Sequence, residues 1–382
     1  MTELAILQLL GWAAVGAVMI LFACTGGFDL GAGMLLPFIG RNDQERRVVL
    51  NVVGPTWDGN QVWLIIVGGA IFAIWPRVYA ATFSGFYFAM LILLWALFLR
   101  PVSFEYRSKI QKQAWKTFWD WALFVGSLVP ALIIGVGIGN VIMGVPYYFD
   151  PITLRFFYTG TFWELLRGFP ILCGLVCVFM MLMHGAAYIA LRTHEVIRIR
   201  AQQAGRLFAI LFVLSFIIGG VWLFVGVPGY QMMSLPRDPS IAPLSNVVTM
   251  SQGAWLTPYL HYPILFIVPF VGLMSALLAA FWHQGETVIR TFYCSALAIA
   301  CTIATFGLTL FPFIMPSSTY PNQSLLVWNA SSSALSLIGI LICALIMLPI
   351  IFVYTTFVYR KLWGRSGVMT VETVEKEGSH LY

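Results

Sequence analysis

Charged side chains are scarce in this sequence. Asp, Glu, Lys and Arg make up 9% of its 382 residues, against about 25% in an ordinary soluble domain. Hydrophobic residues account for 60%, so polar groups are too few to cover the surface of a soluble fold. This shortage excludes a soluble globular protein, a disordered chain and a nucleic-acid-binding protein, and it predicts that lipid is the main solvent.

Cysteine and histidine are also few, and their spacing is not that of a metal site. The six cysteines lie inside apolar stretches, with no CxxC pair and no neighbouring histidine, so neither a disulfide framework nor a zinc site is indicated. Of the five histidines, only His184 lies inside a long apolar run, where an axial haem ligand would have to be. A lone histidine in a membrane is more often a hydrogen-bonded packing residue, so haem ligation by this chain alone is not expected.

Long apolar runs occupy most of the chain. A spanning helix needs about 20 mainly apolar residues, and the runs of this length predict nine spans. The first run has no basic segment before it and no cleavage site after it, so it is expected to remain as a span. No soluble domain or linker is apparent, and residues 1–382 are expected to form one polytopic membrane domain. The predicted spans are residues 5–28, 57–76, 78–99, 121–142, 168–191, 207–227, 258–282, 291–312 and 333–359.

The basic residues between the spans predict the orientation of the chain. With nine spans, seventeen of the 21 Lys and Arg residues fall on one side, and the positive-inside rule assigns that side to the cytoplasm. The net charge of +6 is therefore interpreted as a topology signal. The N-terminus is expected on the periplasmic side and the C-terminus in the cytoplasm. The other side receives Arg77, Arg155, Arg167 and Arg237.

Two acidic residues lie close to the expected membrane depth, where an unpaired charge is costly. Asp29 follows the first apolar run within a segment that contains four glycines, and glycines permit close helix packing. The alternative is an acid at a helix end, hydrated by headgroups. Asp58 stands with Asn60 and Gln61 at the start of the second span. It either stabilises the helix N-terminus or relays protons beside amides that hold water.

Arg100 and Asp120 lie at the two ends of the loop between the third and fourth spans, with Glu105 between them. Snorkelling of Arg100 to the headgroups is one explanation. The other is that the acid and the base pair with a partner subunit or with a cofactor carboxylate. The remaining basic residues of the loop are interpreted as orientation signals. The glycines of the first span, including Gly31, are expected to pack against a permanent partner.

Several stretches resemble subunit II of the bacterial cytochrome bd-type quinol oxidase. Their order and spacing make the resemblance specific, and it runs from the first span to the last. Gly26 stands where some relatives have an acid, so no second carboxylate is expected beside Asp29. The stretches are GFDLG at 27–31, RNDQERR at 41–47, WDGNQVWL at 57–64, GGA at 68–70, FSGFY at 83–87, RP at 100–101, YRSK at 106–109 and FPFIMPSS at 311–318.

The resemblance implies a respiratory complex of the bacterial cytoplasmic membrane that oxidises quinol and reduces oxygen to water. Two b-type haems and one d-type haem would be ligated by subunit I, the obligate partner. This chain would ligate no haem and no metal. It would be an all-α protein, with nine helices arranged as two four-helix bundles plus one peripheral helix. Some relatives add small accessory subunits, and some hold a structural quinone within subunit II.

The resemblance also implies roles for the ionisable residues. Asp58 would belong to a proton pathway from the cytoplasm toward the haem site, whereas Asp29, Arg100 and Asp120 would support the haem region indirectly. A secondary transporter is the competing class of function, since charged membrane residues and glycine-interrupted helices also mark substrate paths. The two halves of the chain do not contain corresponding broken segments, which disfavours it. A purely structural scaffold differs only in that Asp58 would not matter for turnover.

Overall fold

The computed structural model describes residues 3–234, 246–282, 287–362, 369–370 and 372. Within these residues, nine helices are long and apolar enough to cross a membrane, which confirms the predicted number. The nine are α1 (Glu3–Ile39), α3 (Trp57–Ile74), α5 (Tyr87–Tyr106), α6 (Gln113–Met143), α7 (Gly168–Arg192), α8 (Glu195–Gly226), α10 (Ile267–Trp282) together with the 3-10 turn before it, α11 (Val288–Leu310) and α12 (Ala334–Leu362).

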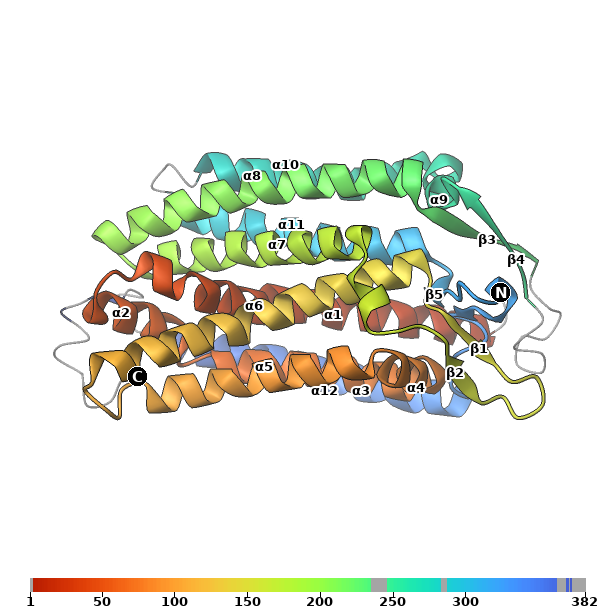
Figure 1. Ribbon diagram of the computed structural model, residues 1–382, viewed down its shortest axis with the longest axis horizontal. Coiled ribbons are helices and arrows are strands. Elements are labelled where there is room, and N and C mark those ends of the chain that lie inside the picture. Colours follow the sequence, from red (N-terminus) through yellow and green to blue (C-terminus); the bar gives the residue numbers. More distant parts are fainter. Residues whose placement is uncertain (1–2, 235–245, 283–286, 363–368, 371, 373–382) are drawn as a thin grey trace.

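The long helices lie side by side along the long axis of the molecule (Figure 1). Helices α1, α3, α5 and α6 form a first bundle, and helices α7, α8, α10 and α11 form a second one. Helix α1 joins the bundles because it also packs against α7 and α11. Helix α12 lies outside both bundles, against α1 and α3. The expected arrangement of two four-helix bundles with a peripheral helix is therefore confirmed.

The two ends of the molecule carry different short elements (Figure 1). One end, called the α2 end below, carries α2 (Asp43–Val53) and the loop between α5 and α6. The opposite end, called the strand end, carries three antiparallel two-stranded sheets. Helix α1 begins at the strand end, and α12 ends at the α2 end. The sheets pair β1 (Tyr147–Phe149) with β2 (Phe156–Tyr158), β3 (Pro228–Ser234) with β4 (Val247–Gln252), and β5 (Phe313–Met315) with β6 (Leu325–Leu326).

Short helices connect the long ones. Besides α2 they are α4 (Pro76–Gly85), α9 (Thr257–His261) and the 3-10 turns η1 (Trp163–Leu166), η2 (Ala254–Leu256), η3 (Pro263–Phe266) and η4 (Pro321–Gln323). The third span was expected at 78–99, and its expected start is wrong. Helix α4 is a separate helix, and α5 begins only at Tyr87. Pro76 starts α4, since proline fits the first helical turn but cannot continue the preceding helix.

Several long helices extend beyond the spans expected from the sequence. Helix α6 begins at Gln113 and not at 121, and α8 begins at Glu195 and not at 207. The expected bounds followed charge-free runs, whereas Gln, Lys, Arg and Glu are favourable helix residues. Charged residues therefore indicate where a helix leaves the lipid, but the helix itself continues through them.

Glycines hold the first bundle against the second one. A Cβ atom at Gly31 of α1 would collide with the backbone carbonyl of Met181 in α7, and a Cβ atom at Gly185 would press on the backbone of α1. Only glycine permits this backbone approach. The expectation that Gly31 packs against a partner subunit is therefore wrong, because its neighbour is α7 of the same chain.

Candidate functional site

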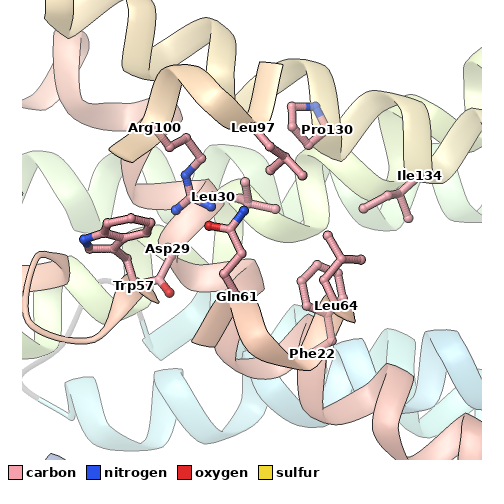
Figure 2. A pocket seen from close by; sticks show the side chains of 11 residues that line it. Phe22, Asp29, Leu30, Trp57, Gln61, Leu64, Leu97, Arg100, Pro130 and Ile134 are labelled. Carbon is pink, nitrogen blue, oxygen red and sulfur yellow. The ribbon is translucent and has the colours of Figure 1, made fainter. Parts of the chain in front are cut away.

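A small pocket lies inside the first bundle, between α1, α3, α5 and α6 (Figure 2). Its volume of about 10 Å³ is close to what one water molecule requires. Its wall is mostly apolar, and Asp29, Gln61 and Arg100 are its polar or charged side chains. Helices α3 and α5, on opposite sides of the pocket, lack close backbone packing against each other. The pocket therefore occupies the loosest part of the first bundle.

Asp29 and Arg100 bring opposite charges to this pocket. Asp29 is 1% exposed and Arg100 is 2% exposed, and each acts electrostatically on the other. In the described part of the chain, Asp29 Oδ1 and Arg100 Nε and Nη2 have no hydrogen-bond partner. An isolated buried charge is strongly destabilising, so each ion stabilises the other. No pattern in the sequence pairs these two residues.

The burial of this pair corrects two interpretations of the sequence. Asp29 is not an acid at a helix end, because α1 continues to Ile39 and the carboxylate lies inside the bundle. Arg100 does not reach the headgroups by snorkelling, because its guanidinium group extends into the bundle, toward Gln61 and Asp29 (Figure 2). Both residues are interior groups of the first bundle.

Asn60 and Tyr359 complete the surroundings of Asp29. The Asn60 Nδ2 group donates a hydrogen bond to Asp29 Oδ2 over 2.7 Å, and the Tyr359 hydroxyl donates to Asn60 Oδ1 over 2.5 Å. Helices α1, α3 and α12 therefore meet at one carboxylate. Tyr359 is 299 residues from Asn60 in the sequence, and no local motif indicated that it belongs to the site.

Asp120 belongs to a separate ion-pair cluster at the α2 end. Its oxygens lie 2.5 Å from Arg107 Nε and 2.8 Å from Arg46 Nη1. Arg107 also binds Asp43 at 2.9 Å, and Lys116 binds the same carboxylate at 2.8 Å. The cluster fastens α2 and the α5–α6 loop to the first bundle. Asp120 is therefore paired within this chain, and one of its partners is Arg107, a residue interpreted only as an orientation signal.

The acidic residues of α2 have lowered pKa values. Burial raises the pKa of Asp43, but the hydrogen bonds and charges of Lys116 and Arg107 outweigh it and hold that pKa below its usual value. Burial likewise raises the pKa of Glu45, but hydrogen bonds from the Arg41 backbone and from Arg200 outweigh burial and hold this pKa below its usual value. Both carboxylates are therefore ionised at neutral pH and hold α2 in place.

Asp58 lies outside the pocket, exposed in the first turn of α3. It forms no hydrogen bond or ion pair with any described residue, and no side chain caps the start of α3. Asn60, which was expected to hold water beside Asp58, points to the other side of α3 because residues two apart do not share a helix face. Gln61 lines the pocket. The structure therefore separates Asp58 from Asn60, whereas Gln61 lies about one helical turn from Asp58.

His184 is a packing residue of the second bundle. Its Nδ1 atom lies 2.7 Å from Ser295 Oγ and its Nε2 atom 2.9 Å from the Cys24 carbonyl oxygen. Its ring stacks on Phe292, with 4.8 Å between the centroids. Both nitrogens have partners within the chain, so His184 does not fit an axial haem ligand. Across the described ranges, no group of three or more His, Cys, Asp or Glu residues is arranged to hold a metal ion.

Comparison with known proteins gives one consistent result. The family model of cytochrome bd terminal oxidase subunit II matches residues 7–362. The chain is 44% identical over 383 residues to cytochrome bd-I ubiquinol oxidase subunit 2 of Escherichia coli strain K12, covering 100% of both chains. It is 32% identical over 365 residues to cytochrome bd ubiquinol oxidase subunit 2 of Bacillus subtilis strain 168, covering 94% of this chain and 98% of the relative.

The fold is similar to a solved structure as well. The structure of bd oxidase from Geobacillus thermodenitrificans contains a chain that superposes with a TM-score of 0.70 at 12% sequence identity, covering 94% of this chain and 99% of that one. Similarity at this identity concerns the fold alone. Together with the family model and the full-length relatives, it shows that the chain belongs to the cytochrome bd terminal oxidase subunit II family.

Proposed function

We propose that this chain is the haem-free subunit II of a quinol oxidase that reduces oxygen to water in the bacterial inner membrane. The observation that carries the proposal is full-length similarity to subunits named as parts of ubiquinol oxidases. The family's haems lie in another subunit, and His184 does not fit a ligand. Subunit I is the obligate partner, and its two b haems and one d haem supply the electron transfer and oxygen chemistry. The comparisons give no support to a secondary transporter.

The α2 end faces the cytoplasm in this proposal. Most loops that join the helices at this end are basic, and the positive-inside rule favours such loops on the cytoplasmic side. Helix α3 begins at this end, so Asp58 would meet protons from the cytoplasm. A carboxylate there can take up a proton from water and release it toward the partner.

Subunit I covers the exposed face of α3 in this proposal. Asp58, Val62, Ile65, Gly69 and Phe72 recur every three or four residues and are all exposed, so they share one helix face. A Cβ atom at Gly69 would meet nothing within 4 Å, which leaves room for another backbone. A proton released by Asp58 on this face passes directly to subunit I and does not cross the Asp29 pocket.

Asp29, Arg100 and Asp120 support the haem region from within this chain. The Asp29–Arg100 pair keeps α1 and α5 together across the pocket, and Asp120 fixes the end of α5 through Arg107. A shift of α5 would change the surface that meets subunit I. A pocket with room for about one water does not fit a quinone ring, so no step is assigned to a bound quinone. Accessory subunits and a structural quinone stay predictions from the family resemblance.

The Asp58→Asn variant of the complete complex tests the proton role. Asn suits a helix N-terminus nearly as well as Asp, so a purely structural Asp58 predicts normal turnover. A relay predicts that quinol-dependent oxygen uptake falls at least about tenfold, because an amide cannot take up and release the proton. Glu195→Gln is the matched control, since Glu195 is also an exposed acid in the first turn of a helix, α8, at the same end.

The haem content must be measured in the same preparations. Full haem content with low oxygen uptake in Asp58→Asn alone supports the relay. Normal oxygen uptake at full haem content removes it and leaves a structural subunit. Absence of a copurifying haem-bearing subunit from the wild-type preparation contradicts the assignment to the oxidase.

A further inference from the structure

Helix α12 is peripheral, yet it reaches the charged interior of the first bundle. Its large side chains are mostly exposed, as for Leu345 and Phe352. Tyr359, near its end, is half-buried, and its hydroxyl group meets Asn60 of α3. A helix that only filled the periphery would not need this polar contact.

The two hydrogen bonds of the Asn60 side chain are compatible with one orientation of its amide group. The Tyr359 hydroxyl donates to Asn60 Oδ1, and the Nδ2 group of the same amide donates to Asp29 Oδ2. A carboxylate accepts hydrogen bonds and an amide oxygen cannot donate one. If the amide turned over, two oxygens would face each other and the carboxylate would move away. The carboxylate therefore selects the amide orientation, and the Tyr359 hydroxyl secures it by donating to the Oδ1 atom on the other side of the amide.

Holding one oxygen of Asp29 determines where the other one lies. Oδ2 is bound by Asn60, whereas Oδ1 has no hydrogen-bond partner in the described part of the chain. The Arg100 guanidinium is likewise buried at the same pocket with two unpartnered nitrogens. The balance of charge across the pocket therefore depends on the rotamer that Asn60 imposes on Asp29.

We propose that Tyr359 and Asn60 are positioning residues of the oxidase, which hold Asp29 opposite Arg100 from the peripheral helix. The inference rests on the proposed function, because Asp29 and Arg100 support the haem region of subunit I there. It adds a contribution of α12 to that support. Neither residue touches a substrate or a haem in this proposal.

The Tyr359→Phe variant tests this role, since it removes one oxygen atom and keeps the ring. Tyr354→Phe is the matched control, because Tyr354 lies on the same helix and is 66% exposed. In purified complexes we expect Tyr359→Phe to lower kcat of quinol-dependent oxygen uptake about fivefold and to change the visible haem spectrum. The KM for quinol should stay unchanged, because the pocket does not bind quinol. Tyr354→Phe should match the wild type in all three measurements.

The Asn60→Ser variant and the double variant Tyr359→Phe with Asn60→Ser distinguish positioning of Asp29 from general packing. Asn60→Ser shortens the link to Asp29 and should reproduce the changes in kcat and spectrum. If Tyr359 acts through Asn60, the double variant should be no worse than Asn60→Ser alone. The inference is overturned if the double variant lowers kcat by the product of the two single effects. It is also overturned if the Tyr359→Phe complex has the same kcat and haem spectrum as the Tyr354→Phe complex. Because the wild-type complex remains an active oxidase in either case, such a failure is distinct from failure of the proposed function.

Discussion

The two bundles consist of similar helices but have opposite interiors. The second bundle closes into a ring of four packed helices, and His184 is buried in it with both ring nitrogens hydrogen-bonded. The first bundle leaves α3 and α5 apart and encloses Asp29 and Arg100. Buried charges are a poor means of stabilising a fold. The difference therefore indicates that the centre of the second bundle serves packing, whereas the centre of the first holds a buried acid and a buried base.

The seam between the bundles should be the most sensitive place in the molecule. Gly31→Leu places a large side chain against the backbone of α7, which cannot move aside as a side chain can, so the cost exceeds the range of about 1–3 kcal/mol for ordinary core overpacking and prevents the two helices from packing. We expect no folded complex. Gly16→Leu, on the same helix with nothing within 4 Å of its Cβ position, should assemble normally. The measurement is the amount of chain in the membrane and in purified complex. Normal accumulation of Gly31→Leu chain without subunit I would place the seam between subunits.

Removal of the buried cation of the first bundle should have the next largest effect. Arg100→Met leaves the Asp29 carboxylate buried without its counter-charge, a change that costs about 3–5 kcal/mol. We expect low yield and loss of haem from the complex. Adding Asp29→Asn should restore part of the yield, because the uncompensated charge disappears. Arg290→Met changes an exposed arginine at the start of α11 and should remain close to wild type. A double variant as poor as Arg100→Met would contradict the pairing.

The corresponding change in the second bundle should be milder. His184→Phe removes two hydrogen bonds but keeps a ring on Phe292, and an unmade buried hydrogen bond costs about 1–3 kcal/mol. We expect a lower unfolding temperature with haem content unchanged. If this variant loses haem as Arg100→Met does, the contrast between the bundles fails.

The smallest effect concerns the ion pairs of α2. The folded pKa of Asp43 is lowered, so its contribution to stability is fully present above the unfolded pKa, near 4, and is lost as the pH falls through the folded pKa. Asp43→Asn should lower the unfolding midpoint at pH 7 by roughly 1–2 °C. The difference from wild type should vanish once the pH lies below the folded pKa. A difference that persists there would show that Asp43 stabilises α2 without its charge.

The sequence determined the helices better than their partners. Hydropathy predicts nine spans because lipid forces every spanning backbone to satisfy its own hydrogen bonds. The break between α4 and α5 was missed because the charge-free run continues through it. Asp29 and Arg100 were identifiable because ionisable groups are rare in membranes. Their pairing was not, since Arg100 is adjacent in sequence to the loop that contains Asp120. Contacts between distant helices, such as Asn60 with Tyr359, leave no local pattern.

The contact between Asn60 and Tyr359 also bears on the order in which the subunit is made. The two residues are 299 positions apart, and ribosomes add about 5–20 residues per second. Asn60 is therefore synthesised about 15–60 s before the tyrosine that anchors it. A chain released before its last helix has the charged pocket but not its anchor. Completion of α12 would thus mark when the subunit is ready to assemble.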